Sequence, residues 1–234
     1  MMLQELRLLF AEVPNQDASK EDYRHAIVDQ NCLQKRSGKT RLLSARHLTT
    51  LYGLDPSLLL FRALRYFWSR DEAGQPLLAL LCAYARDPLL RSSAPFVLDL
   101  AEGAVFHLEA MESFLDAPDP GHYSESTSES LTKNLSATWK DSGHLAGKAP
   151  KYRSRAVSTE GATAYALLLG YLTGARGSAL FQTEYAHLLD CPEDRALLLA
   201  EIAAQRSWIS FKRIGKLMEI SFPLFLSVES GEKA

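Results

Sequence analysis

Apolar residues recur along most of this chain at the three- and four-residue spacing of amphipathic helices. The first stripe extends from Leu3 to Val13. A second follows Ser19, which begins a "SKED" segment that resembles a capping box. The segments 75–85 and 93–101 are apolar nearly all round and are expected as central core helices. On this pattern, helices are predicted over residues 3–13, 19–33, 42–52, 55–68, 75–85, 93–101, 102–115, 159–173, 178–189 and 192–206.

The pattern changes near the end of the chain. Residues 208–222 contain a short apolar run, a basic turn with Gly215 and then alternating apolar and polar residues, which predicts a β-hairpin. Further upstream, "DAPDPGHYS" (116–124) carries two prolines and a glycine and is the best candidate for a domain boundary. The expected fold is therefore mainly α, with two small helical domains over residues 1–118 and 119–234, the second carrying the short hairpin.

Composition is that of an ordinary globular protein. The chain of 234 residues can form one large or two modest domains, and it is 47% hydrophobic and 23% charged. The three cysteines are far apart and odd in number, which argues against a disulfide framework and favours a cytoplasmic protein. The longest uncharged run, 161–175, is shorter than the roughly 20 apolar residues of a spanning helix, so no membrane segment is expected.

Charge is distributed unevenly. The net charge is −2, so binding to a polyanion would require a local concentration of cations. From Glu109 to Glu129 there are six acids and no lysine or arginine, whereas from Lys133 to Arg155 there are six lysines and arginines and one acid. A second basic run lies between Asp29 and Asp55, where no acid occurs.

Motifs for catalysis or cofactor binding are lacking. "QKRSGKTR" (34–41) ends like a phosphate-binding loop, but Leu33 stands where that motif needs its first glycine. The six histidines are scattered singly, with no Cys-x-x-Cys pair, so no metal site is predicted. No serine lies in a nucleophile elbow. The sequence predicts a protein that is not an enzyme, with no cofactor and no small-molecule substrate.

Two short helices are predicted next to the first basic segment. "STSE" (126–129) reads as a capping box for a helix that ends near Leu135, and Ser136 would cap a second short helix closed by Gly143. A pair of short helices followed by a basic segment predicts a winged helix-turn-helix that binds double-stranded DNA.

This geometry assigns a role to each polar side chain of the segment. Apolar residues would point inward, namely Leu131, Leu135, Trp139 and Leu145. Outward-facing residues that could reach bases are Thr138, Lys140 and Ser142, and cations that could take phosphates are Lys133, Lys148, Lys151, Arg153 and Arg155. A further set of nucleic-acid-binding candidates lies in the N-terminal basic loop, namely Lys35, Arg36, Lys39 and Arg41. Solvated charged loops are the alternative interpretation of both segments.

Several stretches, taken in order, resemble one protein family. They are "RHAIVDQNCLQKRSGKTR", "LYGLDPSLLLFRAL", "LLALLCAYARDPLLR", "NLSATWKDSGHLAGK" and "LLLGYLTGARGSALFQTEYAHLLDCP". This ordered set resembles the BrxA proteins of BREX phage-defence systems. The resemblance implies a non-enzymatic, all-helical protein with a NusB-like N-terminal part, which binds double-stranded DNA and has other BREX proteins as candidate partners.

Two alternatives remain open. A NusB-like fold can also serve RNA, in which case the basic loop at 35–46 would be the contact. A protein-binding scaffold, whose basic segments meet acidic partner surfaces, is the second alternative.

Overall fold

The computed structural model describes residues 1–215 and 217–226 and shows a mainly helical chain. The helices are α1 (Leu3–Glu12), α2 (Lys20–Val28), α3 (Gly38–Tyr52), α4 (Leu59–Trp68), α5 (Gln75–Arg86), α6 (Pro88–Leu98), α7 (Leu108–Asp116), α8 (Glu125–Asp141), α9 (Glu160–Leu172), the 3-10 helix η1 (Gly177–Gln182), α10 (Glu184–His187) and α11 (Glu193–Gln205). The strands are β1 (Val105–Phe106), β2 (Leu145–Gly147), β3 (Lys151–Arg153), β4 (Ser210–Ile214) and β5 (Leu217–Ser221). The predicted helical fold and the hairpin near the C-terminus are confirmed.

Local hydrogen bonding explains where the first helices begin and end. Ser19 forms the predicted capping box, with Asp22 as its reciprocal partner. Gly53, with φ of 86°, ends α3 in a conformation that glycine adopts without strain. Helix α4 was predicted to start after Asp55 but begins four residues later, because the Asp55 carboxylate accepts from the backbone N–H of Ser57 and closes a turn there.

The two helices predicted over 93–115 differ from those observed. Helix α6 begins earlier, since Asp87 accepts hydrogen bonds from the first backbone N–H groups of the helix and Pro88 occupies its first position. Helix α7 begins only at Leu108, because Val105 and Phe106 form strand β1. That strand pairs antiparallel with β3, which lies some 45 residues further along the chain.

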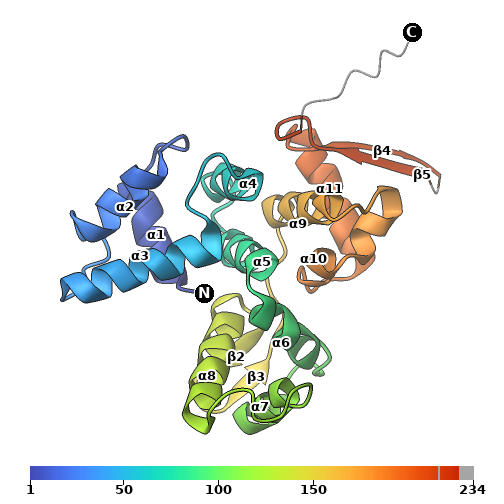
Figure 1. The fold of residues 1–234 in the computed structure, drawn as a ribbon. Helices are drawn as coiled ribbons and strands as arrows, with labels where there is room; N and C mark the ends of the chain where they lie inside the picture. Colours follow the sequence, from blue (N-terminus) through green and yellow to red (C-terminus); the bar gives the residue numbers. More distant parts are fainter. Residues whose placement is uncertain (216, 227–234) are drawn as a thin grey trace.

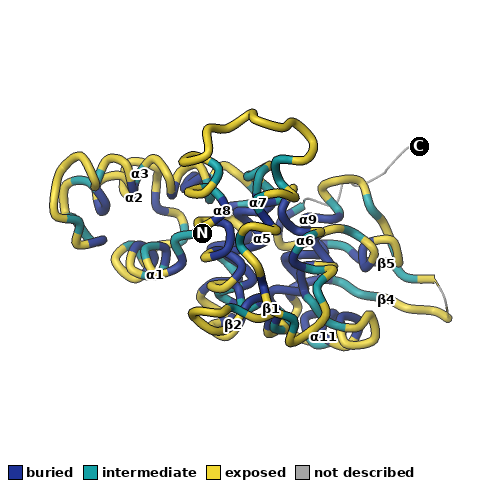
Figure 2. The backbone as a smooth tube through the Cα atoms, turned by 90° about the horizontal axis from the view of Figure 1, so that it is seen from below, coloured by how far each residue is buried: buried dark blue, intermediate teal, exposed yellow. Residues whose placement is uncertain are grey.

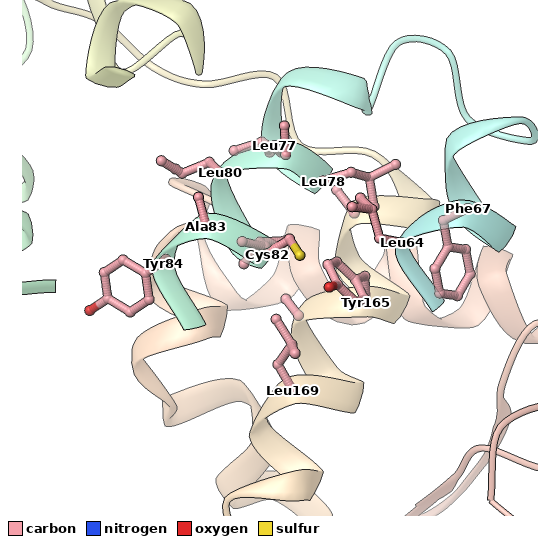
Figure 3. Close-up of a cluster of buried hydrophobic side chains, with 14 of the residues drawn as sticks. Leu64, Phe67, Leu77, Leu78, Leu80, Cys82, Ala83, Tyr84, Tyr165 and Leu169 are labelled. Carbon is pink, nitrogen blue, oxygen red and sulfur yellow. The ribbon is translucent and has the colours of Figure 1, made fainter. Parts of the chain in front are cut away.

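The core is built around α5, as its apolar sequence predicted. Helices α4 and α9 pack against α5, and their side chains interdigitate in Figure 3. Every residue from 161 to 170 of α9 is buried. The buried hydroxyl of Tyr165 on α9 donates to the Leu60 carbonyl of α4 at 3.0 Å, so the contact is directional as well as apolar.

A buried carboxylate joins the start of α5 to the start of α9. Asp71 accepts from the Thr159 hydroxyl at 2.5 Å and from the Ala162 N–H at 3.2 Å. Gly161 is needed beside it, since a Cβ at that position would lie 2.5 Å from an Asp71 oxygen. This contact fixes α9 against the N-terminal half of the chain.

The other elements are arranged around this centre in Figure 1. Helices α1–α3 lie on one side of α5, while α9–α11 and the β4–β5 hairpin lie on the other. Helices α6–α8 and the small sheet of order β1-β3-β2 lie together below α5. Buried residues form one continuous core through these groups, seen as the dark blue segments of Figure 2. The β1–β3 pairing joins residues on both sides of the boundary expected at 118, and the division into two domains stays a prediction.

Candidate nucleic-acid interface

The pair of short helices expected between residues 126 and 142 is wrong. Residues 125–141 form one continuous helix, α8, whose N-cap is Ser124, with its side chain accepting from the Thr127 N–H. No glycine or proline interrupts this segment, so the helix has no reason to break at Ser136. Ser136 lies buried in its interior, and Gly143, with φ of 92°, ends it as expected.

The continuous helix changes which side chains face outward. Residues 135, 138, 139 and 142 fall at i, i+3, i+4 and i+7 and therefore share one face. Trp139 is fully buried, as predicted, and its indole N–H donates to the Ser93 hydroxyl at 2.8 Å. Leu135 and Leu145 are also buried, whereas Leu131 is half-buried.

Thr138 and Ser142, the expected base contacts, lie on this inward face. They are only 5% and 2% exposed. The Thr138 hydroxyl donates to the Asn134 carbonyl, and the Ser142 hydroxyl lies 2.8 Å from His144 Nδ1. The outward orientation predicted for both is wrong, because it assumed a helix that started afresh at residue 136.

The outer face of α8 carries Lys133, Ala137 and Lys140, all exposed. Lys133 forms an ion pair with Glu129 of the same helix at 2.5 Å, which neutralises part of its charge. Lys140 lies in the last turn and forms no ion pair with any carboxylate of residues 1–215 or 217–226. With Lys140 and Asp141, the C-terminal half of α8 carries no net charge, whereas the N-terminal half, with Glu125, Glu129 and Lys133, is net negative.

The expected basic arm is a β-hairpin rather than a free loop. Strands β2 and β3 pair antiparallel, and Lys148 lies exposed in the turn between them. Lys151 of β3 reaches across to donate to the Ser136 hydroxyl, which attaches the hairpin to α8. Partial burial lowers the pKa of Lys151 and the nearby charge of Lys140 lowers it further, while the nearby Asp141 carboxylate opposes both. We call Lys140, Lys148 and Lys151 the α8–β3 basic cluster.

The two arginines of this segment are bound within the fold. Arg153 and Asp190 form an ion pair at 2.7 Å, with side chains only 5% and 6% exposed. Burial alone would raise the pKa of Asp190, but hydrogen bonds from Arg153 and from the Ala156 N–H outweigh it and lower that pKa. Arg155 is exposed and pairs with Glu102 at 2.9 Å. Arg153 was predicted to bind a phosphate. Its side chain is instead buried in the ion pair with Asp190, so that prediction is wrong.

A buried histidine beside this ion pair had no signal in the sequence. His144 Nε2 lies 3.1 Å from the Leu188 carbonyl, so that nitrogen carries the proton and Nδ1 accepts from Ser142. Burial lowers the pKa of His144 to about 4, against the opposing effect of Asp190. His144 and Arg153 together fix the hairpin to the loop before α11. A lone histidine next to a helix-ending glycine gave no indication of this role.

Acidic side chains lie at the other end of α8. Helix α7 and the first turn of α8 line a groove of about 350 Å3, with Glu109, Glu112, Asp116 and Glu125 on its walls. These carboxylates would repel a phosphate backbone. The surface near α8 is therefore divided into an acidic N-terminal part and a basic C-terminal part.

The N-terminal basic loop is only partly free. Lys35 pairs with Glu5 at 2.9 Å, and Arg41 donates to the Val28 carbonyl at 2.8 Å. Arg36 is exposed just before α3 and Lys39 in its first turn, on either side of the capping box that Ser37 forms. Figure 1 places this turn at the far end of α3 from α8, so the two basic segments do not form one patch.

Other classes of site receive no support from the described part of the chain. No three metal-ligating side chains within residues 1–215 and 217–226 are grouped so as to hold a metal ion. No helix among these residues has both the length and the apolar character needed to cross a membrane. No family model, curated protein or solved structure matches this chain.

Proposed function

We propose that this protein binds double-stranded DNA through a winged-helix unit formed by α6, β1, α7, α8, β2 and β3. This order of elements, with the sheet order β1-β3-β2, is that of winged-helix DNA-binding domains. The helix pair of the unit is α7 and α8, joined by residues 117–124, and the β2–β3 hairpin is its wing. Helix α8 takes the place of the helix that lies in the major groove.

The α8–β3 basic cluster is the observation that carries the proposal. Its three lysines come from the last turn of α8, the wing turn and strand β3, and the structure shows none of them paired with a described carboxylate. Cations gathered on one helix end and the adjoining hairpin would attract the negatively charged backbone of a duplex. Because most of the acids near α8 lie around its start, and Asp141 alone lies in its last turn, DNA would contact the end of α8 and the wing.

The biological setting rests on the resemblance to BrxA proteins. It places this DNA binding in a BREX phage-defence system, in a non-enzymatic role and with other BREX proteins as partners. A NusB-like arrangement of the N-terminal helices belongs to the same proposal.

The test removes the charge of the cluster. Lys140, Lys148 and Lys151 are replaced together by glutamine, which keeps most of each side chain. Fluorescence anisotropy on one duplex over a series of salt concentrations should give the wild type a log-log slope of about −3, for about three phosphate contacts. The variant should lose most of that slope and bind weakly and uniformly across sequences.

A matched control carries the same number of charge changes on α3. Arg36, Lys39 and Arg46, all exposed, are replaced together by glutamine, and thermal melting checks both folds. This control should bind duplex DNA like the wild type. If it loses nucleic-acid binding while the cluster variant keeps it, the contact is on α3 and the RNA-binding alternative becomes the better account.

A further inference from the structure

The β4–β5 hairpin extends away from the core at the end of the molecule opposite α1–α3 (Figure 1). One strand packs on the body of the protein: Ile220 is buried, half-buried Met218 packs against the core beside Gly177, and the rings of Phe211 and Phe181 lie 6.5 Å apart between their centroids. From Lys212 to the turn every residue described on β4 is exposed. The hairpin is therefore an arm attached mainly along one strand.

The tip of this arm carries an apolar pair that the fold does not use. Ile214 and Leu217 are cross-strand partners that flank the turn, and they are 80% and 74% exposed. No other large apolar side chain described is as exposed. Single exposed apolar residues are common, but two facing each other at a projecting tip indicate a surface that is covered in a complex.

The charge of the arm indicates which kind of partner covers the apolar pair at its tip. Behind the apolar pair the arm carries Lys212 and Arg213, both exposed, and its only acid is Glu219. An antiparallel pairing of β4 with a second copy centred on Lys212 would place two lysines opposite each other, which is unfavourable. A polyanionic partner complements these cations, and apolar side chains on basic arms can insert between base pairs from the minor groove.

We infer that the β4–β5 arm is a second DNA contact, in which Ile214 and Leu217 form a wedge that enters the minor groove and kinks the duplex. Lys212 and Arg213 would lie against the flanking phosphates. This inference rests on the proposed function, since it adds to the contact made by the winged-helix unit. The unit would position the protein by phosphate contacts, and the arm would deform the DNA.

The experiment measures bending separately from binding. A duplex of about 30 base pairs carries a donor and an acceptor dye at its two ends, and energy transfer is read at saturating full-length protein. Wild-type protein should raise the transfer efficiency, because a kink of roughly 20–90° shortens the end-to-end distance. Ile214→Ser with Leu217→Ser should return the efficiency to that of free DNA and weaken binding by about tenfold.

The matched control removes two exposed leucines elsewhere, Leu172→Ser and Leu198→Ser, which are 47% and 46% exposed. This control should bend DNA like the wild type. If the tip variant bends DNA as much as the wild type and binds it equally well, the arm does not contact DNA as inferred. The winged-helix proposal would be unaffected by that result. If the wild-type protein binds no duplex DNA, both the winged-helix proposal and the inferred arm contact are wrong.

The alternative partner is examined in the same samples. Sedimentation of the wild type and of the tip variant without DNA shows whether the tip joins two copies. A dimer that is lost in the tip variant, with bending unchanged, would assign the tip to self-association instead.

Discussion

The two hairpins of this protein are both basic, but they differ in how their lysines and arginines are used. The β2–β3 hairpin has strand β1 as a third strand, is hydrogen-bonded to α8 and holds Arg153 in a buried ion pair. The β4–β5 hairpin has two strands, packs on the core through Phe211, Met218 and Ile220, and leaves Lys212 and Arg213 exposed. Both are rich in lysine and arginine. A basic segment can therefore serve the fold, a ligand or both.

The difference lies in the acids that the fold brings to each hairpin. Asp190 and Glu102 come from elsewhere in the chain and pair with Arg153 and Arg155, whereas Lys151 donates to a neutral hydroxyl and keeps its charge unpaired among the described carboxylates. Among residues 1–215 and 217–226, Glu219 on the neighbouring strand is the only acid that pairs with a β4 cation. The number of free cations thus depends on tertiary contacts and not on the local sequence.

The largest effect is expected from removing the charge of Asp190. Asp190→Asn keeps the size of the side chain, and asparagine tolerates the left-handed backbone at this position, where φ is 55°. The change leaves the Arg153 guanidinium buried without its carboxylate, which typically costs about 3–5 kcal/mol. Urea denaturation followed by circular dichroism should show this loss in the free energy of unfolding.

The control for Asp190→Asn is Glu102→Gln on the exposed partner of Arg155. Their side chains are 62% and 57% exposed, so the loss should stay within the 0–1 kcal/mol of surface ion pairs. Equal losses in the two variants would mean that the Arg153 ion pair is not the anchor of the hairpin.

A smaller effect is expected from the protonation of His144. Its pKa is about 4 in the folded protein, below the ordinary value of 6.5, so the unfolded chain binds a proton at a pH where the folded protein does not. This contribution to stability is complete above pH 6.5 and is lost as the pH falls toward 4. Its full size is about 3 kcal/mol, from roughly 1.4 kcal/mol per pKa unit. Denaturation at several pH values between 7 and 4.5 should show the decline.

The matched variant for this prediction is His144→Gln, which does not titrate. Its free energy of unfolding should fall less between pH 7 and 4.5 than that of the wild type. The other five histidines are exposed and remain in both proteins, so the difference isolates His144. Asp190 contributes at lower pH, because its pKa lies below 3.8. Parallel pH profiles for the two proteins would contradict the assignment.

The helices and the C-terminal hairpin could be predicted because their signals are local. Helix α9 follows from its apolar run, α2 from the capping box at Ser19, and the β4–β5 hairpin from its alternation around Gly215. The strands β1, β2 and β3 could not, since each has two or three residues and forms only when distant segments meet. Helix α8 was divided in two because serine is common at helix starts, although Ser136 is buried within it.

The candidate site was predictable to the extent that its charges needed no distant partner. Lys140 and Lys148 are exposed, as expected from an acid-poor segment. The loss of Arg153 from the interface depends on Asp190, 37 residues away, and no pattern around Arg153 indicates that contact. Thr138 and Ser142 were misplaced by the error in helix continuity. Site residues were therefore less predictable than the elements that carry them.

The smallest effect is expected from the same carboxylate-to-amide change in the other hairpin, Glu219→Gln. Glu219 lies 4.0 Å from Lys212, and their side chains are 74% and 72% exposed, so water screens the pair and its removal should change the free energy of unfolding by less than about 0.5 kcal/mol. Because Glu219 is the only acid of the arm, its removal should instead strengthen duplex binding by about twofold and steepen the salt dependence slightly. Urea denaturation and fluorescence anisotropy are measured on both Glu219→Gln and Asp190→Asn. The two variants apply the same carboxylate-to-amide change to an exposed and to a buried ion pair. A loss of stability near that of Asp190→Asn would show that the β4–β5 cations also serve the fold, and the contrast between the hairpins would fail.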